Sequence, residues 1–433
     1  MQRRQPRVLL ISSVNPTIGP GVNAILIYNA LKKYGIEVDL MTKYKVKDHP
    51  EFLNIFNRYE RKQGYISRLF NRIISVVKIP RQKDSYFFFY KKETSPPVPI
   101  KKILAKITKD YDIIQVYFWQ GLLSYKTIGA IFDKHKCVVR FSCADYSTMT
   151  GGCHFPINCD QYKFGCGNCP AIYSSKLKDF TYYNIKFRHN IISKIHPIID
   201  LNTYMMNCYF GRSVLFKNYD RFKFTHSIVN LSLFYPQKRE NLRNELGITT
   251  DYEYVFFFGC QSLNDQRKGV SELVESLGIL YDSLNVNQRN SILIILAGRD
   301  SLQIEDIIPF KSKSMGFIPE HELSKVYSVS DLFLSPSIND AGPLMVLQSI
   351  ACGTPVISYE VGHAIDFVKS RNTGYCAKNF DTKDFAMKIL QFMRLSKLDQ
   401  EEMRKQCRKV AEDNFSEKAY VDNYLKTYYE CVN

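Results

Sequence analysis

The sequence contains no run of about 18 uninterrupted apolar residues, the length that a membrane-spanning helix needs. Its first apolar run, Val8 to Val14, is short and ends at Asn15-Pro16 without a small-residue cleavage site. We interpret this run as a buried strand and not as a signal peptide. Low-complexity tracts and short-period repeats are also missing. These features predict an intracellular globular protein.

Acidic residues are scarce relative to basic ones: 42 Asp and Glu stand against 59 Lys and Arg, giving a formal net charge of +17. This balance favours an anionic partner, and nucleic acid, an anionic membrane face and phosphorylated substrates all stay open. With 45% hydrophobic and 23% charged residues, the composition is that of an ordinary folded protein. The length of 433 residues suits two domains of about 200 residues each.

Short apolar runs alternate with helical patterns along the chain, which predicts an α/β fold with doubly wound parallel sheets. The strands predicted in the first half are Val8 to Val14, Val38 to Met41, Ile113 to Phe118, Cys137 to Phe141 and Leu201 to Met205. Those predicted in the second half are Tyr254 to Gly259, Ser291 to Ala297, Asp331 to Ser335 and Pro355 to Ser358. We place the interdomain linker at Phe234 to Glu240. The expected domains are residues 1–235 and 236–415, with a C-terminal helix of residues 416–433 that returns to the first domain.

The segment from Pro336 to Pro355 follows a predicted strand and enters a helix, with Pro343 at the favoured N1 position. Unpaired backbone N–H groups at such an N-terminus, with the helix dipole behind them, attract anions such as a diphosphate. Asp340 lies just before this helix and Gln348 lies more than one turn into it. Both are therefore expected to face one ligand at the carboxyl ends of the strands. An ordinary capped helix is the alternative interpretation.

These residues resemble the retaining GT-B glycosyltransferases of family four. The signature of that family is a carboxylate, seven residues, a second carboxylate and an Ala-x-Gly-x-Pro-Val-like tail. Here seven residues separate Asp340 from Gln348, and the tail runs from Ala351 to Val356. The resemblance implies that Asp340 contacts the donor sugar and that Gln348 holds the ribose hydroxyls. Gln in place of Glu still forms hydrogen bonds but loses the charge assistance.

The same resemblance implies the GT-B architecture, in which two Rossmann-like domains face each other across a donor cleft. A second match runs from Phe258 to Gly269. It implies that Lys268 places its ammonium on the donor diphosphate and that Arg267 assists, whereas Cys260 replaces an arginine of the family. The other expected donor contacts are Gly298, Gly316, Phe317, Ile318, Gly342, Leu344 and Met345.

The first domain resembles the family more loosely. Gly19 and Gly21 allow the backbone to approach a ligand closely, as the family's glycine loop does, and a simple turn is the alternative. The segment from Phe141 to His154 resembles a subgroup that makes exopolysaccharide or capsular polysaccharide. It has Ala144 where many members have a sugar-contacting His, and it keeps Asp145, our candidate for the cleft-facing polar residue.

The resemblance also implies a retaining mechanism, in which the acceptor attacks from the leaving-group side and the diphosphate helps to deprotonate it. Catalysis then requires no cofactor, and Asp145, Lys268 and Asp340 are the candidate catalytic residues. The expected donor is a UDP- or GDP-sugar. The expected acceptor is a glycan or a polyprenyl-diphosphate-linked glycan in capsular, exo- or lipopolysaccharide synthesis. A catalytically silent carbohydrate-binding relative and a GT-B-fold sugar-nucleotide epimerase stay open as alternatives.

Four cysteines and a histidine lie within 17 residues of one loop, residues 143–175. The cysteines are Cys153, Cys159, Cys166 and Cys169. The Cys-x-x-Cys half has the spacing of a zinc knuckle, and four thiolates complete a tetrahedral structural site. We therefore predict structural zinc, with free buried thiols or disulfides as the alternatives.

The segment from Lys43 to Lys92 contains 13 Lys and Arg against 4 Asp and Glu. Apolar residues from Ile66 to Val77 follow helical spacing, with Arg68 and Arg72 on other faces. Two interpretations stay open: a helix lying in an anionic membrane interface, and a helix covering its own domain. Nucleic acid is disfavoured because no binding motif is present. We expect a peripheral protein at the cytoplasmic face of the cell membrane.

Overall fold

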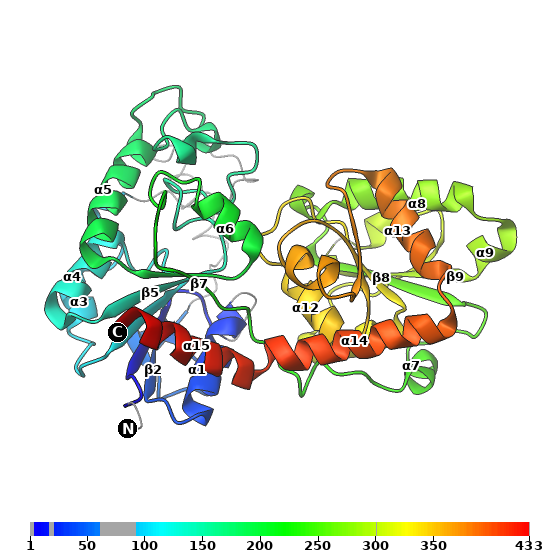
Figure 1. Ribbon diagram of the computed structural model, residues 1–433, viewed down its shortest axis with the longest axis horizontal. Helices are drawn as coiled ribbons and strands as arrows, with labels where there is room; N and C mark the ends of the chain where they lie inside the picture. The colour runs from blue at the N-terminus through cyan, green and yellow to red at the C-terminus, as the bar shows by residue number, and fades with distance from the viewer. Residues whose placement is uncertain (1–3, 17–20, 61–91, 300, 433) are drawn as a thin grey trace. The chain divides into compact units, whose positions relative to one another are not determined.

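The computed structural model describes residues 4–16, 21–60, 92–299 and 301–432. Gly19 and the predicted amphipathic helix around Ile66 to Val77 lie outside these residues. The chain divides into two units, and their segments can be followed by residue number in Figure 1. Unit 1 contains Met1–Asn202, Met206–Thr225 and Val421–Asn433, and unit 2 contains Thr203–Met205 and His226–Tyr420.

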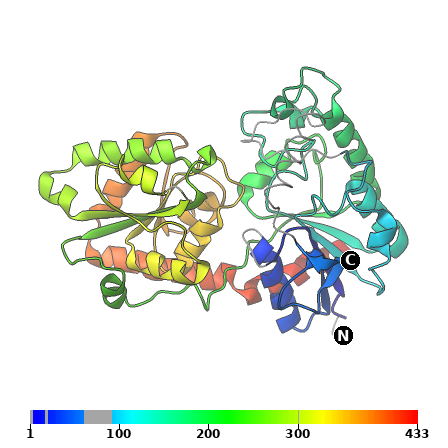
Figure 2. The ribbon, with the colours of Figure 1, turned by 180° about the vertical axis from the view of Figure 1, so that it is seen from behind.

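Unit 1 is built on a parallel sheet of seven strands in the order β3-β2-β1-β4-β5-β6-β7. The strands are β1 (Val8–Ser12), β2 (Val38–Lys45), β3 (Leu53–Tyr59), β4 (Ile113–Tyr117), β5 (Val138–Cys143), β6 (Ile198–Leu201) and β7 (Phe222–Phe224). The helices of this part of the chain are α1 (Val22–Lys33), α3 (Ile100–Leu104), α4 (Tyr125–His135), α5 (Phe180–Ile195) and α6 (Tyr204–Phe210). Every residue of β1 and β4 is buried, because helices cover both faces of a parallel sheet. Figure 2 shows α4 and α5 packed side by side against this sheet.

The last helix, α15 (Glu417–Val432), packs through its C-terminal part against the sheet of unit 1. Arg140 of β5 is fully buried and donates to the carbonyl of Tyr424 at 3.4 Å and to Thr427 Oγ1 at 3.0 Å. Its guanidinium also pairs with the carboxylate of Asp200 in β6 at 3.0 Å and lies 4.3 Å from the ring centre of Tyr424. One buried charge therefore joins two strands to the C-terminal helix.

Unit 2 is built on a parallel sheet of six strands in the order β10-β9-β8-β11-β12-β13. The strands are β8 (Tyr254–Ser262), β9 (Ile292–Arg299), β10 (Lys311–Ser314), β11 (Leu332–Ser335), β12 (Val356–Tyr359) and β13 (Gly374–Ala377). The helices are α7 (Arg239–Glu245), α8 (Val270–Ser283), α9 (Val286–Asn290), α10 (Ser301–Glu305), α11 (Glu320–Val329), α12 (Leu344–Ala351), α13 (Thr382–Met393) and α14 (Lys397–Phe415). Short helical turns are η5 (Gln266–Lys268) and the π-helix η6 (Ala364–Lys369).

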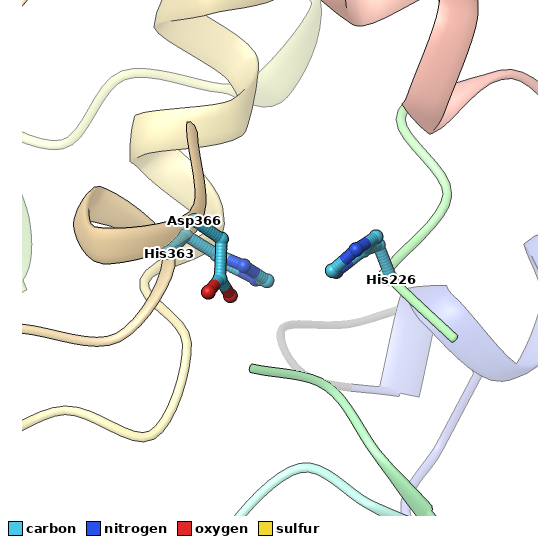
Figure 3. A group of neighbouring side chains, drawn as sticks. All are labelled: His226, His363 and Asp366. Atoms are coloured by element: carbon cyan, nitrogen blue, oxygen red, sulfur yellow. The ribbon is translucent and has the colours of Figure 1, made fainter. Parts of the chain in front are cut away.

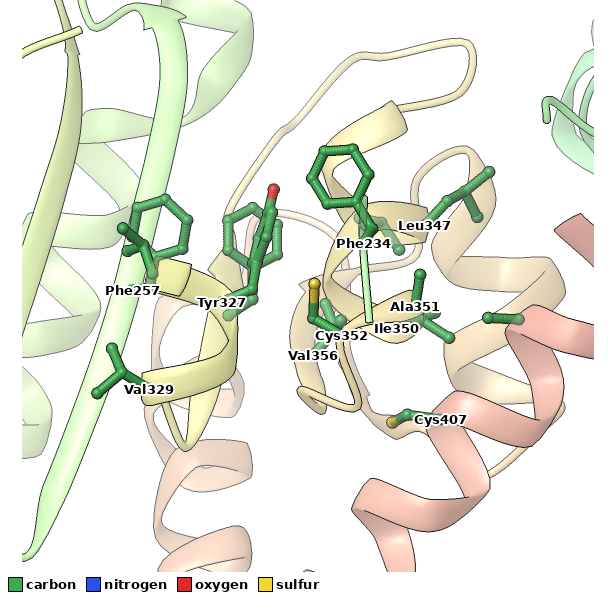
Figure 4. Close-up of a cluster of buried hydrophobic side chains, with 14 of the residues drawn as sticks. Phe234, Phe257, Tyr327, Val329, Leu347, Ile350, Ala351, Cys352, Val356 and Cys407 are labelled. Atoms are coloured by element: carbon green, nitrogen blue, oxygen red, sulfur yellow. The ribbon is translucent and has the colours of Figure 1, made fainter. Parts of the chain in front are cut away.

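The core of unit 2 consists of two hydrophobic layers, one on each face of this sheet. Tyr254, Phe256 and Phe258 of β8 point into the layer formed with α8 and α13. Val255 and Phe257 alternate with them and join the layer formed with α12 and α14. Figure 4 shows part of this second layer, with Phe257 beside Tyr327 and α12 facing Cys407 of α14. Because both faces are covered, β8 has a continuous apolar sequence from Tyr254 to Phe258.

The predicted architecture of two Rossmann-like parallel-sheet domains is confirmed. One predicted strand, Leu201 to Met205, is wrong, because β6 already ends at Leu201 and α6 begins at Tyr204. The chain turns there because the Asp366 carboxylate accepts the Tyr204 N–H and Thr203 Oγ1 donates to the Ala341 carbonyl. The outer strands β3, β7, β10 and β13 were not predicted, since they are short or partly exposed and lack a continuous apolar run. No described helix is long and apolar enough to cross a membrane.

Candidate active site

The loop that leaves β11 approaches α12 with a carboxylate at its centre. Asp340 Oδ1 accepts the backbone N–H of Gly342 at 3.1 Å, which closes a short turn. Pro343 then has extended backbone angles and is the N-cap of α12, so its predicted N1 position is corrected by one residue. Gly362 packs directly under this turn, because a Cβ there would lie 2.6 Å from Pro343 Cδ. The turn is therefore held against the loop that follows β12.

The Asp340 side chain forms an ion pair with Lys268, its Oδ2 lying 2.5 Å from the lysine Nζ. Burial by itself would raise the pKa of Asp340, but Lys268, Arg267 and the Gly342 N–H together hold the pKa below its usual value. Asp340 is therefore ionised at neutral pH. The two residues are 72 positions apart in the chain, and both are only partly accessible to solvent.

Lys268 is presented by a tight turn and not by the helix that follows. It ends η5, whose N-cap Asp265 accepts the Arg267 N–H at 3.1 Å and pairs with the Arg267 guanidinium at 2.6 Å. Gly269 has a φ of +67°, and a Cβ there would lie 1.9 Å from the Pro336 carbonyl oxygen. The Ile338 N–H donates to the Arg267 carbonyl at 2.9 Å. These contacts join the lysine turn to the aspartate loop.

The loops that contain the expected donor contacts Gly298 and Gly316 to Ile318 also lie together in unit 2. The Gly298 N–H at the end of β9 donates to the Gly316 carbonyl at 2.7 Å. Gly298 has a φ of +139°, and a Cβ there would lie 2.3 Å from the Cys260 carbonyl oxygen. Phe317 is 63% exposed, whereas Ile318 packs against the core layer beside α12. The loops thus present one exposed aromatic ring, that of Phe317.

On α12, Leu344 and Met345 are partly buried against the core and Gln348 is buried. Met345 contacts the end of β8, since a Cβ on Gly259 would lie 3.0 Å from its Cε. Strand β8 ends before the Lys268 turn, and β11 ends before the Asp340 loop. The predicted residues of the second domain therefore gather at the carboxyl ends of neighbouring strands, where open α/β sheets bind ligands.

Of the two predicted glycines in unit 1, the structure describes Gly21. It precedes α1, and a Cβ there would lie 2.0 Å from the Asn15 carbonyl oxygen, so the turn after β1 requires a glycine.

Asp145 is buried and pairs with a histidine that sequence analysis did not assign to the site. His154 Nδ1 lies 2.7 Å from Asp145 Oδ2, and the Ser147 N–H donates to Asp145 Oδ1 at 2.7 Å. Burial would raise the pKa of Asp145, but His154 and the Ser147 contacts lower it below its usual value. The signal was present in the sequence as a His nine residues after the Asp, in a segment already singled out for its glycines and cysteines.

A second cluster missed by sequence analysis consists of His226, His363 and Asp366 in unit 2. Their ligand atoms all lie within 4.8 Å of one another, the one such group among the described residues. Figure 3 shows His363 and Asp366 together on the loop and π-helix after β12, with His226 facing them. Burial and the neighbouring His226 lower the pKa of His363 to about 3, and burial raises the pKa of Asp366 to about 6. His363 is therefore a neutral imidazole. The nearby charge of Asp340 acts to raise its pKa but does not outweigh burial.

Comparisons with known proteins match the second half of the chain to one family. Residues 238–413 match the family described as "Glycosyl transferases group 1". Alpha-monoglucosyldiacylglycerol synthase of Acholeplasma laidlawii is 25% identical over 213 residues, which are 43% of this chain and 52% of that protein. The chain spans less than two thirds of the length of these curated relatives, with shares of 36%, 52%, 40% and 58% in four of them.

Solved structures resemble the chain over nearly its whole length. Sucrose-phosphate synthase of Thermosynechococcus elongatus has a TM-score of 0.68 at 18% identity and covers 99% of both chains. HepE of Anabaena, solved in complex with UDP and glucose, has a TM-score of 0.61 at 11% identity and covers 98% of this chain and 100% of its own. At such identities the likeness establishes the fold alone. Residues 238–413 therefore form a group 1 glycosyl transferase domain, in a chain with the GT-B fold.

Proposed function

We propose that this protein is a retaining glycosyltransferase of family four, which moves a sugar from a nucleotide-sugar donor to an acceptor. The main support is the ion pair between Lys268 and Asp340 at the N-terminal end of α12. A cation, a carboxylate and the N-terminal end of a helix at one sheet edge suit the diphosphate and the sugar of a nucleotide-sugar donor. The cation and the helix face the phosphates, and the carboxylate accepts hydrogen bonds from sugar hydroxyls.

In this proposal the enzyme acts by positioning and electrostatics. Lys268, assisted by Arg267 and the first N–H groups of α12, stabilises the negative charge that develops on the departing diphosphate. Asp340 orients the sugar, since its lowered pKa keeps it an acceptor of hydrogen bonds at neutral pH. No side-chain nucleophile or cofactor takes part. The acceptor attacks from the side of the leaving group, and the diphosphate oxygen takes its proton.

For the nucleotide, we propose that the loops at Gly298 and Gly316 hold the base and that Gln348 holds the ribose. The exposed ring of Phe317 is available to stack on a base. A uracil base is favoured because HepE, which shares the fold, was solved with UDP. In unit 1, we propose that Asp145, with His154 as its partner, faces the acceptor.

For the acceptor, we propose a glycan or polyprenyl-diphosphate-linked glycan of surface polysaccharide synthesis, at the cytoplasmic face of the membrane. Two observations support a lipid-linked acceptor. The Acholeplasma relative is named for a glycosylated diacylglycerol product, and the net charge of +17 suits an anionic membrane surface.

The test is to incubate the full chain with UDP-, GDP- and ADP-sugars and polyprenyl-diphosphate-linked glycans. We expect one UDP-sugar to be consumed only when acceptor is present, and NMR to show that the new bond keeps the anomeric configuration of the donor. An inverted product would exclude the retaining mechanism. Binding of UDP without turnover on any acceptor would favour the silent carbohydrate-binding alternative. Interconversion of sugar epimers without transfer would identify an epimerase.

A further inference from the structure

The loop between β5 and α5 contains little regular secondary structure. Within the described residues, its only regular elements are the single turns η3 (Gln161–Lys163) and η4 (Pro170–Ile172). Its separate hydrophobic cluster is formed by Cys169, Ala171 and Ile172, with Cys153 and Cys159 among the side chains packed on it. Cysteines therefore occupy the places that larger apolar side chains fill in an ordinary core.

The four cysteines of this loop surround one small cavity. Cys153, Cys159, Cys166 and Cys169 all line it, together with the backbone of Gly151, Gly152 and Gly167, and its volume is about 20 Å³. This is room for a single ion or water. All four residues are free thiols, without a disulfide between them. Among the described residues no three of their sulfurs lie within 4.8 Å of one another, so the sulfurs line the cavity without closing on it.

Hydrogen bonds hold the backbone at three of these cysteines. The Cys159 N–H donates to the Pro156 carbonyl and the Cys166 N–H to the Gln161 carbonyl, both at 2.8 Å. The Cys169 N–H donates to the Asp179 carboxylate at 3.1 Å. These bonds keep the three side chains at the cavity.

The turn that contains Cys166 has an unusual backbone. Cys166, Gly167 and Asn168 have φ values of 60°, 89° and 45°, so three successive residues are left-handed. A Cβ on Gly167 would lie 1.9 Å from the Leu177 carbonyl oxygen. The two non-glycine residues of this turn, Cys166 and Asn168, adopt a costly conformation, and such a turn persists when other bonds hold it in place.

We propose that Cys153, Cys159, Cys166 and Cys169 bind one Zn²⁺ ion as a structural tetrahedral site, and that this site positions His154 against Asp145. Zinc is favoured because four sulfur ligands leave no open coordination position and match its softness. Binding requires the sulfurs to move inward to about 3.8 Å from one another, as Zn–S bonds of about 2.3 Å demand. Each thiol gives up its proton to solvent as its sulfur binds the ion.

The zinc site is linked to His154 by the sequence neighbour Cys153 and by hydrogen bonds of the loop. Cys153 directly precedes His154, and its carbonyl accepts the Thr150 hydroxyl at 2.5 Å. The His154 carbonyl accepts the Tyr146 N–H at 3.1 Å, next to Asp145. Arg188 of α5 donates to the carbonyls of Ser147 and Thr150. A fixed Cys153 therefore fixes both ends of the hydrogen-bonded loop in which Asp145 and His154 meet.

The metal part of this proposal is tested on the purified full chain without any activity assay. Elemental analysis is expected to find one zinc per chain. Titration with a mercurial thiol reagent is expected to release that zinc as four thiols react, read with a colorimetric zinc indicator. Cobalt substitution is expected to produce the thiolate charge-transfer and visible bands of a tetrahedral sulfur site. Metal-free folded protein, or cobalt bands without thiolate charge transfer, would overturn the proposal.

Variants distinguish the cysteine site from the cluster of His226, His363 and Asp366 as the place where the metal binds. Cys166→Ser with Cys169→Ser is expected to lose the zinc, and the exposed Cys208→Ser is the matched control that keeps it. His363→Asn is expected to keep it as well, so loss of metal in that variant would assign the ion to the cluster of His226, His363 and Asp366. The thiol-release experiment needs no variant and decides the question even if the double variant does not fold.

The positioning part rests on the proposed function and has its own readout. Removal of zinc is expected to shift the imidazole resonances of His154, assigned by their loss in His154→Gln. Affinity for UDP is expected to stay within about twofold, because Lys268 and Asp340 belong to unit 2. Unchanged His154 resonances on metal loss would overturn the positioning role and leave the proposed function untouched.

Discussion

Two opposite charges meet at the carboxyl ends of the strands of unit 2. Lys268 and Asp340 form an ion pair there, and this pairing helps to lower the pKa of Asp340. In the proposed function, a donor brings a diphosphate to Lys268 and a hydroxyl to Asp340, and so replaces this pairing with two new ones.

We expect Lys268→Ala to weaken UDP binding by about tenfold to a hundredfold, the range for losing a hydrogen bond to a charged group. Isothermal titration of the full chain measures this, and Lys268→Arg is expected to retain most of the affinity. Lys325→Ala is the matched control, because Lys325 also pairs with carboxylates, those of Glu245 and Glu322, but lies on α11. Equal weakening in both alanine variants would mean that Lys268 does not contact the diphosphate.

The burial of His363 predicts that unit 2 loses folding stability in acid. Its pKa is lowered to about 3 in the folded protein, against 6.5 unfolded, so its contribution to stability is present above pH 6.5 and is lost as the pH falls towards 3. At pH 5 the loss is about 2 kcal/mol. Asp366 has the opposite pH dependence. Its pKa is raised to about 6, so its contribution to folding stability is lost as the pH rises through that value.

The measurement is urea unfolding of wild type and His363→Asn at pH 7 and pH 5. We expect the variant to lose less stability between the two pH values than wild type, whatever its absolute stability. A pH dependence identical in both proteins would show that His363 is not buried as a neutral imidazole.

At the scale of elements, a buried charge connects the helix α15 to the sheet of unit 1. Its C-terminal part contacts the β5 and β6 strands through Arg140, which bonds to the Tyr424 carbonyl, to Thr427 and to Asp200. We expect Arg140→Met to cost about 3–5 kcal/mol, because it leaves the Asp200 carboxylate buried without its partner. Urea unfolding followed by circular dichroism measures the loss.

Two further variants check the cause of that loss. Arg140→Met combined with Asp200→Asn is expected to recover part of the stability, since the uncompensated charge is gone. Lys223→Met removes the exposed pair with Glu430, which also joins the sheet to α15, and is expected to cost less than about 1 kcal/mol. A similar cost for both single variants would assign the effect to lost packing instead of to charge.

At the scale of the whole molecule, the charge of +17 predicts binding to anionic surfaces. We expect the full chain to sediment with phosphatidylglycerol vesicles and not with phosphatidylcholine vesicles, and 0.5 M salt to weaken the binding. Arg68→Glu with Arg72→Glu is expected to reduce it, because Lys43 to Lys92 contains 13 basic residues against 4 acidic ones. Binding without dependence on lipid charge, or a double variant that binds as wild type, would contradict this prediction.

The sequence by itself determined the alternation of strands and helices and the residues of the donor motifs. Central strands such as β1 and β8 are buried on both faces, so each is visible as one continuous apolar run. The motifs also marked Gly269 and Gly298 in the sequence, whereas their positive φ values were evident only from the structure. Outer strands such as β7 and β10 were not, since a short and partly exposed strand has no apolar pattern of its own.

Only the tertiary structure decided which side chains meet. Lys268 and Asp340 are 72 residues apart, and Arg140 and Tyr424 are 284 apart, so no local pattern connects them. The same holds for His226 and His363, which no spacing rule relates. Even Asp145 and His154, which are close in sequence, are paired by a loop that depends on hydrogen bonds from Arg188 and between Tyr146 and His154. Local propensity determines the helices and strands. Bringing distant charges together costs conformational entropy, and only the interactions of the complete fold offset that entropy.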